Sequence, residues 1–354
     1  MESETFIFGF DLSSFPRWMI LAIGIGGVFG SFLLQGFAHE KIFKKYKFNE
    51  SLFLTFLQFL CYASLSFKLF YNLFRGRSKL HAPFWFYFVT AFALVSSTAL
   101  SNFSLERITY PTQVLFRSSK LIPVMLGSFF FLKKRYSILE IVSVFLIVAG
   151  LIGISMSDKK VHNKIDAMGL IAIIASLFAD AFASNLEEKA FSQYQAPQDE
   201  VIAIIYLIGS FLVGGLSVPT GQFTKGIKQC SENPGLVVSI VLFSYLGAIG
   251  IQFVYLIIKS FGSVVAVMVT SLRKAFTVCL SFLLFSDKKF TIYHFFSIVI
   301  ISSGIGLNVY GKRNSKEQKQ KDRKSDSYTS PMDSPIENDI GAQVDDSSEN
   351  NQQV

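Results

Sequence analysis

The sequence predicts an all-α integral membrane protein, with ten transmembrane helices in two inverted five-helix repeats and a disordered C-terminal tail. Three observations predict this class. Of the 354 residues, 51% are hydrophobic and 16% are charged, whereas a soluble protein usually carries about 25% charged residues. The apolar residues form long runs, and one part of the sequence repeats in another at a fixed spacing. Helices are the expected form of these runs, because a helix satisfies its own backbone hydrogen bonds in lipid.

Ten apolar runs are long enough to cross a bilayer as helices, since about 20 residues span its apolar thickness of about 30 Å. In order, the predicted spans are 17–37, 51–74, 83–105, 110–132, 137–156, 167–188, 200–219, 236–258, 263–286 and 291–311. Most breaks carry charged or turn-forming residues, as in HEKIFKKYK and SENPG. The short ERIT separates the third and fourth spans, because their fused length of about fifty residues is too long for one crossing.

The domain organisation follows from these spans. We expect an N-terminal cytosolic segment at 1–16, one five-helix repeat at 17–156 and a second at 167–311. The tail, 312–354, is rich in Ser, Asp, Gln and Lys and is expected to be disordered. An even number of crossings puts both termini on one side of the membrane. The basic cluster that opens the tail predicts that this side is the cytosol.

An internal repeat relates the two halves. Shifting the sequence by 154 residues aligns 120–150 with 274–304. The aligned pairs include Lys120 and Lys274, Ser143 and Ser297, and Gly150 and Gly304. Because five crossings separate the two lysines, the second unit is inverted relative to the first. Inverted repeats are typical of secondary transporters, which bind substrate near the bilayer midplane between the repeats.

Four cations lie inside predicted spans, namely Arg117 and Lys120 on the fourth span and Arg273 and Lys274 on the ninth. Each costs about 2.5 to 3.5 kcal/mol at a helix centre, so the four would cost on the order of 10 kcal/mol if all of them faced lipid. They are therefore expected to face a wet cavity or a partner.

Polar residues accompany these cations at helical spacing. One stripe consists of Gln113, Arg117 and Lys120, and the other of Thr270, Lys274 and Thr277. Residues at i, i+4 and i+7 share one face of a helix. Arginine offers paired donors to phosphate or sulfate, and lysine offers a mobile charge. The two stripes predict a binding site for an anionic small molecule.

An alternative is that buried acids neutralise the cations. Asp180 lies inside the sixth span, and Glu187 and Glu188 follow about two turns later. In a mixed interpretation, Asp180 or Glu187 holds a cation while the site is empty. Gln252 and Tyr255 on the eighth span either line the cavity or form hydrogen bonds between helices.

Other functional classes receive little support. The sequence has no glycine-rich phosphate loop that would indicate ATP-driven pumping. The three cysteines and four histidines lack metal-ligand spacing, so no metal or other cofactor is expected. The basic residues lie between the spans and form no single face, so nucleic acid is not an expected partner. No catalytic constellation appears, which argues against an enzyme.

Three segments, YPTQVLFRSSKLIPVMLGSFFFLKKRYS, ADAFASNLEEKAF and MVTSLRKAFTVCLSFLLFSDKKFT, resemble the nucleotide-sugar transporter family of the drug/metabolite transporter superfamily. LLQGFAHEKIF in the first span is most similar to the branch that carries 3'-phosphoadenosine 5'-phosphosulfate. The resemblance covers about 17–312. It implies a Golgi membrane location, phosphate binding by Lys120 and Lys274, and exchange of the activated nucleotide from the cytosol for a lumenal nucleotide monophosphate or bisphosphate. TSLRKAF replaces the GALNK segment of GDP-sugar carriers, which argues against GDP-mannose.

Alternating access is the expected mechanism. An empty site leaves several cations unneutralised in a passage of low dielectric constant, so the empty carrier should change between its two conformations less readily than the loaded carrier. This difference favours antiport. A UDP-sugar transporter of the same fold and an anion channel remain alternatives. Membrane lipid is the expected surrounding partner, and the sequence leaves a homodimer open.

Overall fold

The computed structural model describes most of the chain up to Gly311. The described residues are 6–7, 10–12, 14–66, 79–105, 107–108, 113, 116–117, 119–157, 166–284, 296–308 and 310–311. The chain divides into two compact units, Met1–Gly311 and Lys312–Val354. The predicted tail is the second unit and lies outside the described residues.

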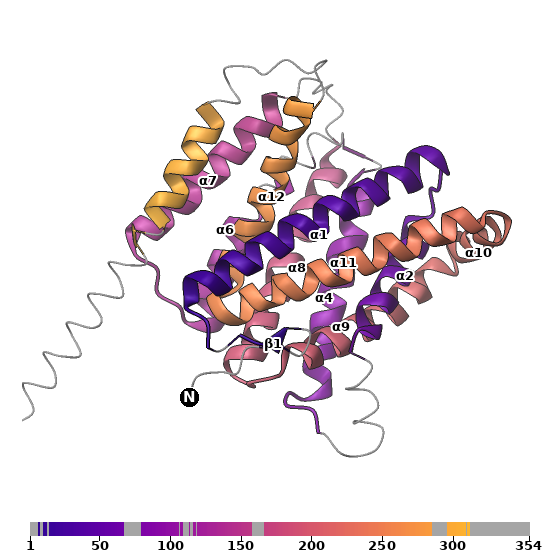
Figure 1. The fold of residues 1–354 in the computed structure, drawn as a ribbon, viewed down its shortest axis with the longest axis horizontal. Helices are drawn as coiled ribbons and strands as arrows, with labels where there is room; N and C mark the ends of the chain where they lie inside the picture. Colours follow the sequence, from indigo (N-terminus) through magenta and orange to yellow (C-terminus); the bar gives the residue numbers. More distant parts are fainter. Residues whose placement is uncertain are drawn as a thin grey trace, which may run out of the picture. The chain divides into compact units, whose positions relative to one another are not determined.

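The described part of the first unit is built almost entirely of helices (Figure 1). The elements are β1 (Phe6–Ile7), β2 (Phe10–Asp11), α1 (Arg17–Lys45), α2 (Ser51–Ser64), α4 (Phe84–Leu105), α6 (Leu121–Leu132), α7 (Ile138–Ser157), α8 (Ala167–Ser192), α9 (Gln198–Ser217), α10 (Gln222–Glu232), α11 (Pro234–Phe261) and α12 (Ser263–Leu284). A further helix covers Phe296–Asn308.

Five of these helices, α1, α4, α8, α9 and α11, contain an apolar stretch long enough to cross a membrane. Shorter apolar helices occupy the other five predicted spans: α2, α6, Ile138–Gly153 of α7, Ser263–Arg273 of α12, and Phe296–Asn308. The break at ERIT is confirmed, because α4 ends at Leu105. A multi-pass membrane protein fits these helices, and the total of ten crossings stays a prediction.

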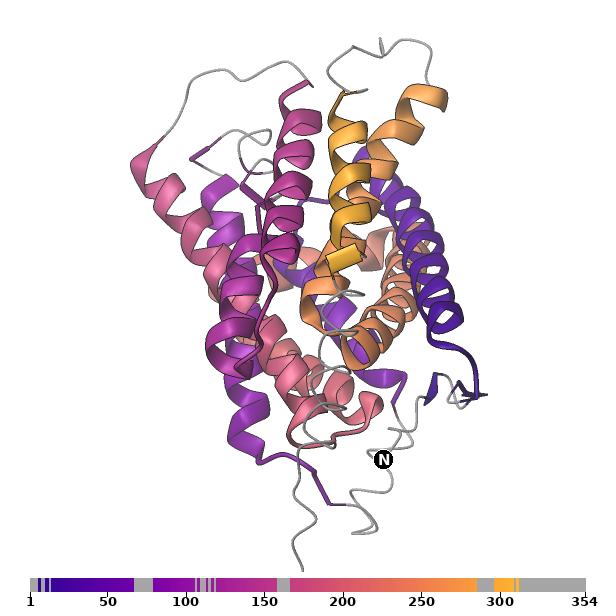
Figure 2. The same ribbon diagram turned by 90° about the vertical axis from the view of Figure 1, so that its left-hand side faces the viewer.

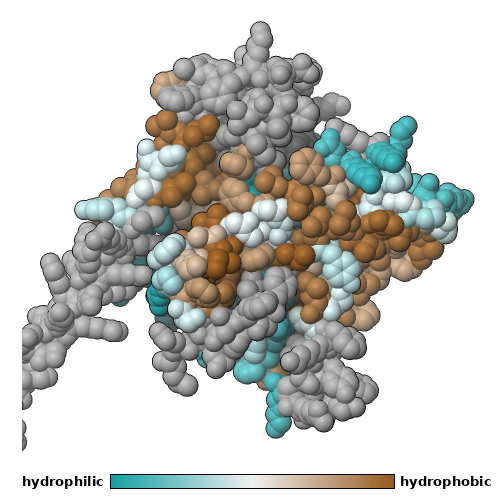
Figure 3. All heavy atoms as spheres, viewed as in Figure 1, coloured by the Kyte–Doolittle hydropathy of each residue, from teal (hydrophilic) through white to brown (hydrophobic). Residues whose placement is uncertain are grey.

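On the face that Figure 3 shows, apolar side chains cover much of the described surface. Ile138, Trp18, Phe130 and Phe211 are 79%, 71%, 71% and 70% exposed. Extensive apolar exposure marks a surface that contacts membrane or another protein in place of water. On an all-helical chain with apolar helices of this length, lipid is the expected covering.

Three features differ from the sequence prediction, in addition to the start of α6, which is described with the candidate site. The helix α1 continues to Lys45, so most of HEKIFKKYK is helical and is not a loop. Its ring contacts explain the extension, because His39 packs between Phe43 and Phe243 at centroid distances of 4.5 and 5.4 Å. At the N-terminus, β1 and β2 pair as a short antiparallel ribbon, in a segment for which no strand was predicted.

The third difference is α10, which has no long apolar run in its sequence. It is a short helix with one apolar face. Phe223 packs against the rings of Phe53 and Phe56 at 5.6 and 5.7 Å. Gln222 accepts a hydrogen bond of 2.9 Å from the backbone N–H of Leu52 near the start of α2, where a helix has free N–H groups. These contacts fix the end of α9 and the start of α11 against α2.

The packing of the helices is matched between the two predicted repeats. In those repeats, α1 corresponds to α8, α2 to α9, α4 to α11 and α6 to α12. The helix α1 packs along α11, as Figure 1 shows, and its counterpart α8 packs along α4. Likewise α2 packs on both α9 and α11, while α9 packs on both α2 and α4. Each of these contacts therefore has a counterpart on exchange of the repeats.

The helices α7 and Phe296–Asn308 lie side by side in both ribbon views (Figures 1 and 2). A Cβ at Gly150 would lie 2.8 Å from the carbonyl oxygen of Ser297, and a Cβ at Gly304 would lie 3.0 Å from that of Ser143. The 154-residue shift converts one contact into the other, because it aligns Gly150 with Gly304 and Ser143 with Ser297. Since numbers rise on one helix as they fall on the other, the two helices run in opposite directions.

We expect Gly304→Ala to destabilise the protein, because the added Cβ would lie 2.8 Å from Ile147 Cγ1 and 3.0 and 3.1 Å from backbone atoms of Ser143 and Ile147. Overpacking of this kind costs about 1 to 3 kcal/mol. Gly306→Ala is the control, since a Cβ there would meet nothing within 4 Å. Thermal unfolding in detergent measures both variants. Equal melting temperatures for them would contradict the close helix contact.

Candidate functional site

The chain turns just before α6, at the position of the first cationic pair. Pro123 has no N–H and fits the first turn of a helix, and α6 begins two residues earlier, at Leu121. Before it, the N–H of Lys120 donates to the carbonyl of Arg117 at 3.3 Å, the spacing of a tight turn. The predicted span 110–132 is therefore not one regular helix, and the side chains of Arg117 and Lys120 reach different neighbours.

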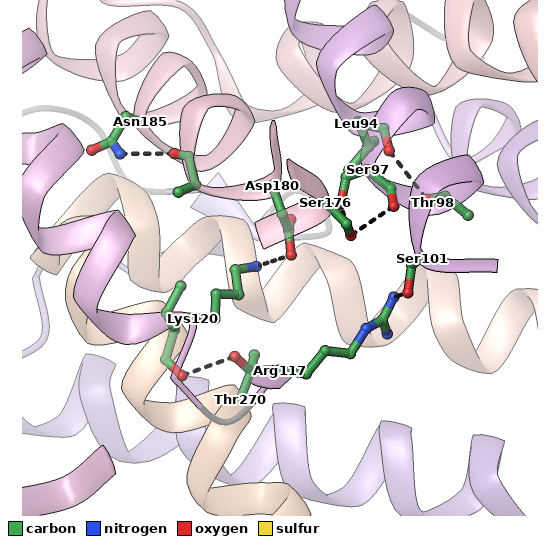
Figure 4. A network of polar contacts seen from close by, with 12 residues as sticks. Leu94, Ser97, Thr98, Ser101, Arg117, Lys120, Ser176, Asp180, Asn185 and Thr270 are labelled. Carbon is green, nitrogen blue, oxygen red and sulfur yellow. Dashed lines mark hydrogen bonds and ion pairs between the residues drawn. The ribbon is translucent and has the colours of Figure 1, made fainter. Parts of the chain in front are cut away.

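Lys120 forms an ion pair with Asp180. Lys120 Nζ lies 2.7 Å from Asp180 Oδ2, and Figure 4 shows the two side chains pointing toward each other between α6 and α8. Asp180 lies near the middle of α8. The side chains are 22% and 30% exposed, so the pair is partly open and not sealed in the core.

Arg117 and Gln113 reach α4 instead. The guanidinium of Arg117 donates to the hydroxyl of Ser101 (Figure 4). The amide of Gln113 is buried, and its Nε2 donates to the carbonyl and hydroxyl of Ser101 at 2.8 and 2.9 Å. Gln113 thus ties the segment before α6 to α4, while the more exposed Arg117 lies closer to the surface of the site.

The second predicted cluster lies on α12. Thr270 lies in the same region as Lys120 and Asp180 in Figure 4. Its hydroxyl donates to the carbonyl of Val267 at 3.1 Å. The guanidinium carbon of Arg273 lies 4.9 Å from the ring centre of Phe32 on α1, a favourable cation–π geometry. The side chains of Lys274 and Thr277 lie outside the described residues.

The remaining candidates form hydrogen bonds between helices. The Tyr255 hydroxyl donates to Glu187 Oε1 at 2.6 Å, joining α11 to α8. Nε2 of Gln198 on α9 donates to both side-chain and backbone oxygens of Gln252 at 2.7 Å. All four side chains are buried. The sequence left two alternatives for Gln252 and Tyr255, cavity lining and hydrogen bonding between helices. In the structure both residues form hydrogen bonds between helices.

A buried polar junction that the sequence did not predict joins α6, α8 and α12. The carboxylate of Glu188 contacts Lys134, which follows α6, and accepts 2.9 and 2.6 Å hydrogen bonds from the N–H and hydroxyl of Ser263. Gly262 precedes Ser263 with a positive φ of 92°. These four residues, Lys134, Glu188, Gly262 and Ser263, are called the Glu188 junction below. Glu188 thus accepts the backbone N–H of Ser263 at the start of α12, where N–H groups have no partner within the helix.

The serines of α4 were not among the predicted site residues, although their spacing in the sequence could have identified them. Ser97, Ser101 and Ser104 occur at i, i+4 and i+7 and therefore share one helix face. All three are buried. The hydroxyl of Ser176 on α8 donates to the carbonyl of Ser97 at 2.8 Å. Small polar residues at this spacing allow α8 and α4 to approach closely and supply the acceptors for Arg117.

One ion pair outside the spans has a defined pH response. Arg107 Nη1 donates to Asp166 Oδ2 at 3.0 Å, and Asp166 also caps α8 through the N–H of Met168 at 3.3 Å. The hydrogen bond from Arg107 is the main reason why the pKa of Asp166 is lowered. The stabilisation is therefore complete above the unfolded value of about 3.9 and is lost as pH falls through the lower folded value.

The groups in this arrangement are chemically suited to binding an anion. Among the described residues, no group of three His, Cys, Asp or Glu side chains is placed to hold a metal ion. Lys120, Arg117 and Arg273 offer cationic donors, and Thr270 offers a hydroxyl. Cationic donors and hydroxyls are the groups that phosphate and sulfate prefer in proteins.

Comparison with known proteins places the chain in a family. The family model of the UAA transporter family matches residues 20–312. A crystal structure that is 13% identical superposes with a TM-score of 0.61 over 83% of this chain and 98% of its own, a likeness that concerns the fold alone.

Similar sequences include three proteins named adenosine 3'-phospho 5'-phosphosulfate transporter 2. The protein of Caenorhabditis briggsae is 36% identical over 86% of this chain and 84% of its own length. That of Mus musculus is 36% identical over 88% and 85%, and that of Homo sapiens is 34% identical over 88% and 78%. The resemblance seen in the sequence is confirmed: the chain belongs to the UAA transporter family, and it is a multi-pass membrane transporter and not an enzyme.

Proposed function

We propose that the chain is an antiporter that moves 3'-phosphoadenosine 5'-phosphosulfate from the cytosol into the Golgi lumen, where it serves sulfation. The names of the relatives support this substrate. The observation that carries the proposal is the partly exposed Lys120–Asp180 pair near the middle of α8. A cation held by one carboxylate at that depth is available to a ligand that brings a stronger negative charge.

The substrate has anionic groups at both ends of adenosine, a 3'-phosphate and a 5'-phosphosulfate. In the proposal, the Arg117–Lys120 cluster on the first repeat binds one end, and the Arg273–Lys274 cluster on the second binds the other. Gln113 and Thr270 orient the cations and the ligand. Glu187, Gln252 and Tyr255 hold the helices that frame the site through their bonds to one another and to Gln198.

The transport cycle is proposed to be alternating access between the two repeats. The matched packing of α1 on α11 and α8 on α4 supports an inverted duplication, as do the contacts of Gly150 and Gly304. Rocking of one repeat against the other would have to break contacts such as those at the Glu188 junction. The counter-substrate is proposed to be a nucleotide monophosphate or bisphosphate, and both termini are proposed to face the cytosol. Lipid surrounds the bundle, and a homodimer is compatible with its apolar surface.

Uptake into proteoliposomes tests the proposal. Labelled 3'-phosphoadenosine 5'-phosphosulfate should enter vesicles preloaded with adenosine 3',5'-bisphosphate, with saturation kinetics, and much more slowly when the vesicles are empty. Unlabelled adenosine 3',5'-bisphosphate should compete, and UDP-sugars should not. Competition by UDP-sugars alone would support the UDP-sugar transporter instead. Flux that neither saturates nor responds to preloading would indicate an anion channel.

A further inference from the structure

We infer that the Glu188 junction is the gate at one end of the carrier, and that α12 is held closed there against α6 and α8 through Ser263. The inference rests on the proposed function and assigns a role in the transport cycle to residues outside the anion site. Glu188 lies eight residues beyond Asp180 on α8, which places the junction about 12 Å from the ion pair. In the proposed topology α8 ends on the cytosolic side, so this gate controls entry from the cytosol.

Three helices meet at Ser263, the first residue of α12. Its N–H and hydroxyl donate to Glu188 of α8 at 2.9 and 2.6 Å. Its hydroxyl oxygen also lies 3.3 Å from that of Ser128 on α6. Ser128 in turn donates to Asn185 of α8 at 2.6 Å. All four side chains are buried, so polar contacts bind the start of α12 to the C-terminal halves of α6 and α8.

Apolar side chains pack between this junction and the ion pair. By their positions along the three helices, Val124 and Met125 of α6, Ala181 of α8, and Val264 and Val267 of α12 lie between the two polar groups. They are 6% exposed or less and belong to one core cluster. A charged nucleotide does not cross such packing, because its charges would lose their water without gaining partners. The site is therefore closed from this end while α12 stays against α6.

The junction is built so that it can open. The side chain of Lys134 is 38% exposed, so the junction lies at the edge of the packed region, and its ionic groups regain water when the helices part. Gly262 alone separates α11, which ends at Phe261, from α12. Because glycine adopts positive and negative φ about equally well, α12 can change its angle to α11 there. Such positions absorb the backbone change when packed elements move apart.

A disulfide across the gate tests the inference. In Ser128→Cys/Ser263→Cys the two sulfurs can reach bonding distance, because the wild-type hydroxyl oxygens are 3.3 Å apart. Oxidation with copper phenanthroline should stop the exchange of 3'-phosphoadenosine 5'-phosphosulfate, and reduction should restore it. The oxidised protein should still bind this nucleotide in a thermal-shift assay, since the site and its other end are not cross-linked. Ser128→Cys and Ser263→Cys alone, oxidised in the same way, control for the native cysteines.

Glu188→Gln tests the gate without a cross-link. A weaker gate lets the carrier open to this end more often, and a ligand on either side binds the state that is open to it. The half-saturation concentration for exchange in vesicles of one orientation should therefore fall at this end and rise at the other. Glu140→Gln is the matched control, because the buried carboxylate of Glu140 accepts from the N–H of Ser137 in its own segment at 2.8 Å. It should leave the ratio of the two concentrations unchanged.

The outcomes separate this inference from the proposed function. If the wild type exchanges no nucleotide, the proposed function fails and the inference fails with it. If the wild type exchanges nucleotide and the cross-linked variant does so at the same rate, the junction stays closed throughout transport and the inference alone is wrong. Equal changes of the two half-saturation concentrations in Glu188→Gln would also overturn it, because a purely structural residue would affect both ends alike. If the cross-link does not form or abolishes binding, the result for Glu188→Gln decides.

Discussion

Lys120→Ala is expected to lower nucleotide exchange on the order of 100-fold, the largest effect of any single change in the site. A hydrogen bond to a charged group contributes about 1.5 to 3 kcal/mol, and its loss alone accounts for most of this factor. The change also leaves Asp180, 2.7 Å away in the wild type, as an unpaired carboxylate facing an anionic ligand. Exchange into preloaded proteoliposomes, normalised to folded protein, measures the effect.

The double variant Lys120→Ala/Asp180→Asn separates the two contributions. Removing the unpaired carboxylate abolishes the repulsion but does not restore the cation, so exchange should recover by about tenfold from the level of Lys120→Ala. Such non-additivity is expected of residues in direct contact. Near-normal exchange in Lys120→Ala, or additive effects of the two changes, would contradict a shared anion site.

Gly262→Ala is expected to be the most destabilising single change that we identify at the Glu188 junction. Gly262 has φ 92° and ψ 164°, a region that is essentially restricted to glycine and costs other residues about 1 to 3 kcal/mol. The new Cβ would also lie 2.7 Å from Glu188 Oε1 and 2.8 Å from Lys134 Nζ. The backbone conformation should lower the free energy of unfolding by about 1 to 3 kcal/mol, and moving Glu188 away from the new Cβ should add to this loss by weakening its hydrogen bonds to Ser263.

Thermal unfolding in detergent measures this loss, with Gly221→Ala as the matched control. Gly221 also has a positive φ, of 70°, but a Cβ there would meet nothing within 4 Å. Replacing Gly221 by Ala should lower the free energy of unfolding only by the cost of the left-handed backbone conformation, about 1 to 2 kcal/mol. If the two variants melt at the same temperature, the carboxylate of Glu188 is not packed against Gly262 as described.

Several features of the fold were predictable because they depend on a single segment. Long apolar runs become helices in lipid whatever their neighbours, and each predicted span contains a described helix. The repeat also contained packing information, since the aligned Gly150 and Gly304 make reciprocal contacts. The helix α10 was not predicted, because a short amphipathic helix has no long apolar run. The turn at Lys120 was not predicted either, although Pro123 indicated where α6 begins.

The partners of the charged residues could not be predicted, because they depend on which helices pack together. The sequence pointed to Asp180 or Glu187 as the acid that holds a cation in the empty site, and it placed Glu188 beside them without a partner of its own. The packing of α6, α11 and α12 on α8 assigns Asp180 to Lys120, Glu187 to Tyr255 and Glu188 to the junction with Ser263. The predicted polar stripe also does not hold its residues on one face. The turn before α6 places Gln113 against Ser101 and Lys120 against Asp180.

An experimental structure determined with adenosine 3',5'-bisphosphate bound would test the central claim most directly. The account predicts the nucleotide between α6 and α12, with one phosphate about 3 Å from Lys120 Nζ, the other phosphate beside Arg273 and Lys274, and Asp180 released from Lys120. A nucleotide bound away from both clusters, or a Lys120–Asp180 pair that stays closed while the ligand is present, would contradict it.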